Sequence, residues 1–153
     1  MAEMGFTLTS PFFRDGGLIT ANHTCDGKNI SPELSWSHAP PDTRSFVLMM
    51  DDPDAPGGTF THWVLFDIPA AVEGLSEGER TIGTPGKNDF QHEWYAGPCP
   101  PPRRGEHRYF LKLYAVDVES LALKRGATRQ EVENTMRGHI LDQTALMGRY
   151  ARR

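Results

Sequence analysis

Two apolar stretches joined by a connection rich in proline and glycine place the strongest constraint on the fold. Residues 45–52, SFVLMMDD, have the continuous apolar character of a buried strand that ends in acids, and residues 61–69, THWVLFDIP, form a second run closed by Pro69. A short connection between adjacent strands usually makes an antiparallel pair. This pairing places Asp52, at the end of one strand, and His62, at the start of the next, at the same edge of the sheet.

The connection itself, DDPDAPGG, contains more than a turn requires. Proline fixes its own φ and pushes the residue before it towards an extended backbone, so the two prolines make the segment stiff. In an extended stretch, Asp52 and Asp54 point to the same side. The pair of glycines that follows is sufficient for the turn. The segment therefore favours a preorganised polar site, although a plain turn remains the simpler alternative.

A metal site in this acidic connection is not supported. An EF-hand loop needs oxygen ligands at alternate positions and a glutamate at the twelfth. Counted from Asp52, the fifth position is Pro56 and the twelfth is Trp63, and counted from Asp51 the twelfth is His62. The cysteines and histidines show no close-paired zinc spacing either. We expect neither a metal nor a cofactor.

A third strand is expected over 107–118, HRYFLKLYAVDV, where apolar residues occupy both faces and Lys112 is the main interruption. His107 opens this strand and Tyr109 points the same way. A lone histidine at a strand edge is usually bonded to backbone, but two histidines here begin strands after proline-rich loops. Together with the aspartates they can form one pocket, in which carboxylates keep the imidazoles protonated and the imidazoles bind an anion.

Nucleophilic catalysis has no recognisable motif. There is no G-x-S-x-G elbow, no P-loop and no dinucleotide fingerprint. A Ser-His-Asp triad stays open, because its members can lie anywhere in a sequence.

Near the end of the chain, residues 128–150, TRQEVENTMRGHILDQTALMGRY, are expected to be helical. Thr128 and Glu131 have the spacing of a capping box. An apolar stripe at four-residue spacing predicts a face packed against the core, formed by Val132, Met136 and Ile140. Gly138 is expected to weaken or divide the helix. The segment 70–98 is expected to contain loops with one short strand that the pattern does not locate.

The overall composition favours one domain spanning 1–153, either all-β or mixed, because 15 glycines and 12 prolines are spread along the chain. The net charge of −4 and the lack of a basic run argue against nucleic-acid binding. No export signal or membrane span is visible, so a cytoplasmic location is expected. In a cytoplasmic chain Cys25 and Cys99 are more often free thiols than a disulfide, although the sequence leaves their pairing open.

Several segments together resemble the phosphatidylethanolamine-binding protein family, and most of all its bacterial Raf-kinase-inhibitor-like branch. The segments are TCDGKNISPELSW, SFVLMMDDPDAP, THWVLFDIP, YAGPCPP, GEHRYFLKLYAVD and GHILDQTALMGRY, and they cover nearly the whole chain. The resemblance implies a mainly β fold, an antiparallel β-sandwich with Greek-key connections and peripheral helices. It also implies a small pocket at one sheet edge that accepts phosphate, acetate or a phosphorylethanolamine-like head group.

The resemblance also implies which residues form this pocket. Carried over one by one, they are Asp52, Asp54, His62, His107, Tyr109, Pro98, Pro100 and Pro101. Only the resemblance brings His107 to the edge that holds Asp52 and His62. Bacterial members tend to be dimers, which suggests a homodimer, whereas kinase binding belongs to animal members and is not carried over.

Three hypotheses about function follow. The first is a non-enzymatic binding protein for small anionic or phosphorylated ligands that regulates a partner protein. The second is a protease or kinase inhibitor that uses the pocket loops as its recognition surface. The third is a phosphoester hydrolase with His62 or His107 as general acid or base, which is the weakest because no nucleophile or metal set accompanies it.

Overall fold

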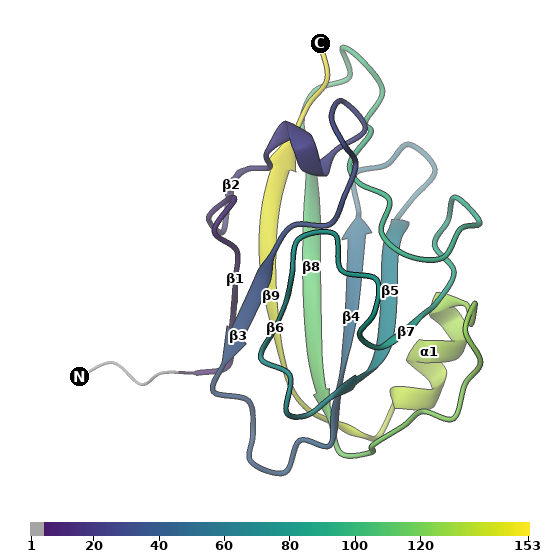
Figure 1. Cartoon of the computed structure of the whole chain (residues 1–153). Helices are drawn as coiled ribbons and strands as arrows, with labels where there is room; N and C mark the ends of the chain where they lie inside the picture. The colour runs from purple at the N-terminus through teal and green to yellow at the C-terminus, as the bar shows by residue number, and fades with distance from the viewer. Residues whose placement is uncertain (1–4) are drawn as a thin grey trace.

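The computed structural model describes residues 5–153 as two β-sheets packed face to face, with one α-helix against the outer side of the larger sheet (Figure 1). The larger sheet has the strand order β2-β9-β8-β4-β5-β7, and the smaller has the order β1-β3-β6. The strands are β1 Thr7–Thr9, β2 Gly17–Leu18, β3 Leu34–Ser37, β4 Ser45–Asp52, β5 Phe60–Pro69, β6 Gly74–Leu75, β7 Thr84–Pro85, β8 His107–Val116 and β9 Ile140–Tyr150. A short 3-10 helix η1, Ala21–His23, and the α-helix α1, Arg129–Met136, complete the fold. The mainly β fold class is confirmed.

The three strands expected from the apolar runs are present. Strands β4 and β5 pair antiparallel, with Asp52 opposite Phe60, and β8 pairs antiparallel with the other edge of β4. The chain therefore returns after β5 to place His107 beside the end of β4. This return brings the two polar motifs of the sequence to one edge of the sheet.

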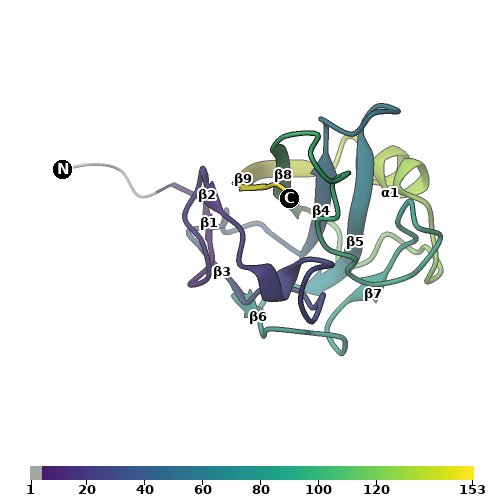
Figure 2. The same ribbon diagram turned by 90° about the horizontal axis from the view of Figure 1, so that it is seen from above.

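Two apolar clusters lie on opposite faces of the larger sheet, and Figure 2 shows how the smaller sheet and α1 flank it. Alternate residues of β4 enter each cluster, so that Leu48 packs between the sheets and Met49 packs beneath α1. Every residue of β4 is buried, as a strand covered on both faces requires. Strand β8 is less completely covered on one face, where Arg108 is exposed and Lys112, the interruption seen in the sequence, is half-buried.

The C-terminal segment corrects the helix prediction. The capping box of Thr128 and Glu131 is present, and Val132 and Met136 are buried against the sheet. The helix ends at Met136, however, because Gly138 adopts a left-handed φ of 85° that terminates helices. Residues 140–150 continue as β9, which pairs with β8 over almost its full length. Ile140, expected in the core, is 42% exposed.

The two cysteines also correct the expectation of free thiols. Cys25 and Cys99 form a disulfide with Cα atoms 5.4 Å apart. The backbone N–H of Cys25 donates to the carbonyl of Pro98 at 3.0 Å, which brings the two loops within bridging distance.

The connection 70–98 contains two short strands, β6 and β7, rather than the single strand expected. Within residues 5–153, no helix has the length and apolar character needed to cross a membrane.

Candidate functional site

A cavity of about 200 Å³ lies at the sheet edge where β4 ends and β5 and β8 begin. Its polar groups come from these three strands, and its apolar walls come from the connections around them. The lining residues are Asp52, Ala55, Pro56, Phe60, His62, Phe90, Cys99, Pro100, Pro101, His107 and Tyr109. Two motifs that are more than 40 residues apart in the sequence therefore meet in one cavity.

Asp52 fixes both the turn and one histidine of the cavity. Its Oδ1 accepts from the backbone N–H of Asp54 at 2.8 Å, which closes an Asx turn over Pro53. Its Oδ2 lies 2.7 Å from Nδ1 of His107, and because a carboxylate only accepts, His107 must donate from Nδ1. Both side chains are almost fully buried. The second ring nitrogen of His107, Nε2, has no hydrogen bond from residues 5–153 and is available to a ligand.

His62 is held by backbone rather than by a carboxylate. Its Nδ1 donates to the carbonyl of Ala96 at 2.7 Å, and the Ala96 N–H donates back to the His62 carbonyl at 3.2 Å. Burial lowers the pKa of His62 below its usual 6.5, despite the opposing effects of the Ala96 carbonyl and Asp52. Burial therefore favours a neutral ring whose proton is on Nδ1 and whose Nε2 lone pair is free. This differs from the expectation that carboxylates keep both imidazoles protonated.

Tyr109 lies between the two histidines. Its ring is stacked on His107 at 6.3 Å and meets the ring of His62 edge-on at 5.4 Å. The residue is only 1% exposed, and its hydroxyl makes no hydrogen bond of good geometry within residues 5–153, although the carboxylate of Asp52 lies close enough to interact with it. Burial, with Asp52 nearby, raises the pKa of this phenol, so it remains a hydrogen-bond donor at neutral pH.

Two of the residues expected in the pocket lie outside the cavity lining. Asp54 turns to Arg108, whose Nε and backbone N–H donate to one carboxylate oxygen at 2.9 and 2.8 Å and whose Nη2 donates to the other. These hydrogen bonds lower the pKa of Asp54 to about 2. Pro98 is buried behind the wall, where its carbonyl accepts from Cys25. The remaining expected residues, Asp52, His62, His107, Tyr109, Pro100 and Pro101, all line the cavity.

Sequence reasoning missed the aromatic wall. Phe60 packs on His62 at 5.1 Å, and Phe90 meets Phe60 edge-on at 4.7 Å. Phe60 precedes His62 by two residues on the same strand, and that spacing puts both on one face. No such periodicity exists for Phe90, because it lies in an irregular connection.

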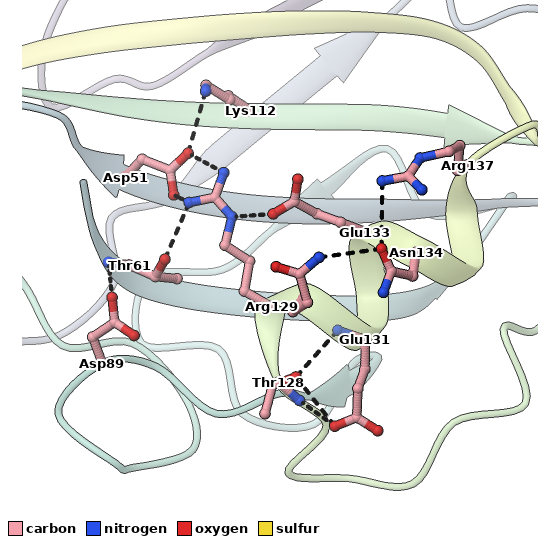
Figure 3. Close-up of polar contacts among 11 residues, drawn as sticks. Asp51, Thr61, Asp89, Lys112, Thr128, Arg129, Glu131, Glu133, Asn134 and Arg137 are labelled. Carbon is pink, nitrogen blue, oxygen red and sulfur yellow. Dashed lines mark hydrogen bonds and ion pairs between the residues drawn. The ribbon is translucent and has the colours of Figure 1, made fainter. Parts of the chain in front are cut away.

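Asp51, which had no expected role, anchors helix α1 on the opposite face of the sheet (Figure 3). Both of its oxygens accept from the guanidinium of Arg129, and Lys112 Nζ approaches to 3.2 Å. Arg129 also donates to Thr61 and Glu133. Asp51 is only 1% exposed, so these cations compensate a buried charge.

The polar groups that the cavity offers to a ligand are Nε2 of His62, Nε2 of His107 and the phenol of Tyr109. Within residues 5–153, no group of three or more histidine, cysteine or carboxylate side chains is arranged to hold a metal ion. The cavity instead presents two imidazole nitrogens and a phenol above an apolar wall.

Comparison with known proteins points to one family. The family model described as phosphatidylethanolamine-binding protein matches residues 9–151. A UPF0098 protein of Aquifex aeolicus is 50% identical over 145 residues, which cover 92% of this chain and 85% of that protein.

Two solved structures have the same fold over nearly their full length. The crystal structure of CT736 of Chlamydia trachomatis, described as a phosphatidylethanolamine-binding protein homologue, superimposes with a TM-score of 0.92 at 35% identity and covers 97% of this chain and 99% of that one. YbcL of Escherichia coli, described as a member of the mammalian PEBP family, superimposes with a TM-score of 0.91 at 29% identity and covers 98% and 100% of the two chains.

Proposed function

This chain belongs to the phosphatidylethanolamine-binding protein family, and from that membership we propose that its cavity binds a small anion, namely phosphate or a phosphorylethanolamine-like group. Membership supports a binding protein as the general kind of function. The identity of the ligand and the residues that bind it are our proposal.

The unpartnered hydroxyl of Tyr109 carries this proposal. A buried hydroxyl without a hydrogen bond costs about 1–3 kcal/mol, so native structures rarely retain one without a reason. This hydroxyl belongs to a residue of the cavity lining and has no partner within residues 5–153. Less than 1 Å² of the hydroxyl is accessible, so an oxygen of a bound anion would satisfy it after a small shift of the neighbouring side chains.

The histidines supply further contacts of the right kind. His107 is fixed by Asp52, so its Nε2 has a defined direction, and His62 is fixed in the same way by Ala96. Because Nδ1 of each ring already donates within the protein, Nε2 donates to a phosphate oxygen only when the ring is charged, and the hydrogen bond is then a strong one. Binding of an anion would therefore raise the pKa of His62 from its lowered value in the empty site.

The size and walls of the cavity limit the ligand. A volume of about 200 Å³ is below the range of about 300–1,000 Å³ that holds a drug-sized molecule. The site therefore suits a head group or a free anion rather than an acyl chain. Asp52 also lines the cavity, but its two carboxylate oxygens accept from the Asp54 N–H and from His107 Nδ1, so these donors occupy the carboxylate.

Thermal unfolding in the presence of inorganic phosphate tests the proposal. A ligand at a hundred times its Kd stabilises the folded state by about 2.7 kcal/mol. We expect this protection in the wild type and its loss in His62→Ala. His139→Ala is the matched control, because His139 is paired with Asp117 at a distant surface site. Equal protection of His62→Ala and wild type would overturn the assignment of this cavity.

The remaining expectations stay predictions. The non-enzymatic role is contradicted if a panel of phosphoesters is turned over and turnover disappears in His107→Ala.

The homodimer is measured by light scattering of the purified chain. A regulated partner protein is sought by affinity capture from the native lysate. The cytoplasmic location also stays a prediction, and it has a chemical consequence, because a reducing compartment would expose the Cys25–Cys99 disulfide to dithiols.

A further inference from the structure

The disulfide lies in the wall of the cavity. Cys99 is a lining residue and is exposed to solvent, whereas Cys25 is half-buried in the loop that follows η1. The bridge joins residues that are 74 positions apart in the sequence. The exposed half of this bond, Cys99, therefore lies at the surface that a reductant in solution meets.

Few backbone hydrogen bonds hold residues 98–102, which form this wall and of which Pro98 and Pro100 are buried. Residues 98–102 read PCPPP, and prolines have no backbone N–H to donate. The wall is held instead by the Pro98 carbonyl, which accepts from Cys25, and by Arg103, whose N–H donates to the Arg152 carbonyl at 3.1 Å. The disulfide is the covalent link that joins these residues to the rest of the protein, in addition to the two hydrogen bonds.

The loop on the other side of the bridge is a firm anchor. Thr24 Oγ1 donates to the Ala21 carbonyl at 2.8 Å, and the Gly27 N–H donates to the Thr24 carbonyl at 3.1 Å. Asp26 accepts from the Tyr150 hydroxyl at 2.5 Å, which ties the loop to the end of β9. Breaking the disulfide would therefore release the wall while the anchor stays in place.

A cation lies beside the exposed sulfur. Nη1 of Arg152 approaches Sγ of Cys99 to 3.6 Å, and Arg152 is itself oriented by Asp26. A neighbouring guanidinium lowers the pKa of a cysteine thiol and makes its thiolate a better leaving group in disulfide exchange. This is the environment of a reactive cysteine rather than of an inert, buried one.

We propose that the Cys25–Cys99 disulfide is a thiol–disulfide exchange site whose redox state controls the ligand cavity, an inference that rests on the proposed anion binding. A dithiol reductant attacks Sγ of Cys99, a mixed disulfide forms, and Cys25 leaves as a thiolate. The second thiol of the reductant then attacks its own sulfur in the mixed disulfide, and Cys99 leaves as a thiolate beside Arg152. The protein gains two electrons and two protons, and the dithiol is oxidised to its disulfide.

The consequence for the cavity is a loss of preorganisation. With the bridge open, Pro100 and Pro101 must be ordered again each time a ligand binds, which lowers affinity. We expect the Kd for inorganic phosphate to rise on the order of tenfold on reduction. Hydrogen exchange of the Arg103 and Arg104 amides, which donate to Arg152 and Pro101, should accelerate at the same time.

The test compares the full chain before and after treatment with dithiothreitol, by phosphate titration and by amide hydrogen exchange. The double variant Cys25→Ala/Cys99→Ala should bind phosphate as weakly as the reduced protein and should not respond to dithiothreitol. Retained tryptophan fluorescence and circular dichroism show that each form is folded. If the oxidised protein does not bind phosphate, the proposed function fails. If the oxidised protein binds phosphate and the reduced protein binds it equally well, the proposal that the disulfide controls the cavity is overturned. This holds whether or not amide hydrogen exchange changes on reduction.

The role of Arg152 has its own readout. Arg152→Leu should slow the appearance of free thiols during reduction severalfold, because the guanidinium no longer attracts and stabilises the thiolate that attacks Sγ of Cys99 in the first step. Arg153→Leu is the matched control, since the structure gives Arg153 no contact with Cys99. Equal rates of thiol release in the two variants would remove Arg152 from the mechanism and overturn the assignment of a reactive site.

Discussion

Asp51 and Asp52 are neighbours on strand β4, yet their carboxylates lie on opposite faces of the sheet. Asp52 accepts from His107 at the cavity, whereas Asp51 accepts from Arg129 of helix α1, as Figure 3 shows for Asp51. Alternation along a strand requires this divergence. Asp52 thus positions a histidine of the cavity on one face of the sheet, and Asp51 holds helix α1 on the other face.

Replacing Tyr109 with phenylalanine separates the ligand role of its hydroxyl from any structural role. The hydroxyl makes no hydrogen bond of good geometry within residues 5–153, so the free energy of unfolding of Tyr109→Phe should equal that of the wild type or exceed it by about 1 kcal/mol. The affinity for phosphate should fall about tenfold to a hundredfold, since a hydrogen bond to a charged group contributes about 1.5–3 kcal/mol. Urea unfolding and calorimetric titration measure the two quantities.

Tyr114→Phe is the matched control for this prediction. Tyr114 lies on the same strand, half-exposed and away from the cavity. Loss of the Tyr114 hydroxyl should leave the affinity for phosphate unchanged. A Tyr109→Phe variant that binds phosphate as tightly as the wild type would show that the buried hydroxyl does not serve a ligand.

Removing Arg129 should destabilise the protein. Arg129→Ala leaves the buried carboxylate of Asp51 with Lys112 as its remaining cation. Breaking a buried pair typically costs about 3–5 kcal/mol, and because Lys112 remains we expect about 2–4 kcal/mol. The free energy of unfolding of Arg129→Lys should lie between those of the wild type and Arg129→Ala, because lysine restores the charge but not the bidentate contact. The free energy of unfolding in urea measures each variant.

Arg125→Ala controls for the loss of an arginine as such. Its pair with Glu93 is solvent-exposed, so removal should cost about 0–1 kcal/mol. In the double variant Asp51→Asn/Arg129→Ala, part of the stability should return, because the uncompensated charge is gone. Equal losses in Arg129→Ala and Arg125→Ala would contradict the buried pair as the source of the stability.

The sequence predicted the strands that build the cavity because their apolar runs are long and bounded by turn residues. Strands β4, β5 and β8 start and end within about two residues of the expected positions. The antiparallel pairing of β4 and β5 followed from the short connection. The long return to β8 has no local signature, which is why only the family resemblance located His107 beside Asp52.

Errors arose where tertiary contacts decide the structure. Residues 140–150 have helical spacing in part, but pairing with β8 and the left-handed Gly138 make them a strand. Asp54 was expected beside Asp52, but the Asx turn at Asp52 and the guanidinium of Arg108 direct it elsewhere. The disulfide depends on a contact between loops that are far apart in sequence, which no local pattern encodes.

Asp54→Asn tests the placement of Asp54 outside the cavity. Phosphate affinity should stay within about twofold of the wild type, because Asp54 is bound to Arg108 rather than to the ligand site. The variant should be less stable at neutral pH. The hydrogen bonds from Arg108 hold the folded-state pKa near 2, against 3.8 in the unfolded chain, so this contribution is present above about pH 4 and disappears as pH falls through about 2.

Urea midpoints at neutral pH and near pH 2 measure this difference in stability. The two proteins should differ at neutral pH and converge in acid. A change in phosphate affinity comparable to that of His62→Ala would instead place Asp54 in the binding site.

The lowered pKa of His62 predicts that stability depends on pH in the empty protein. Burial disfavours the charged ring in the folded state, whereas the unfolded chain takes up a proton near pH 6.5. The unfolded state therefore binds more protons below that pH, and the free energy of unfolding should fall as the pH is lowered from about 7 towards 5. His62→Gln cannot be protonated and should show a shallower decline. Urea unfolding across this range, in buffer free of phosphate, measures both slopes.

Phosphate bound to the charged ring of His62 should weaken the dependence of stability on pH. An anion beside His62 stabilises the imidazolium, so phosphate should bind more tightly as the pH falls, once its own protonation is taken into account, and the decline in stability should flatten in its presence. The Hε1 resonance of His62, followed by NMR, should titrate at a higher pH with phosphate than without. A titration midpoint unmoved by saturating phosphate would mean that the anion does not contact His62, and parallel pH profiles for the wild type and His62→Gln would mean that its burial does not destabilise the charged form.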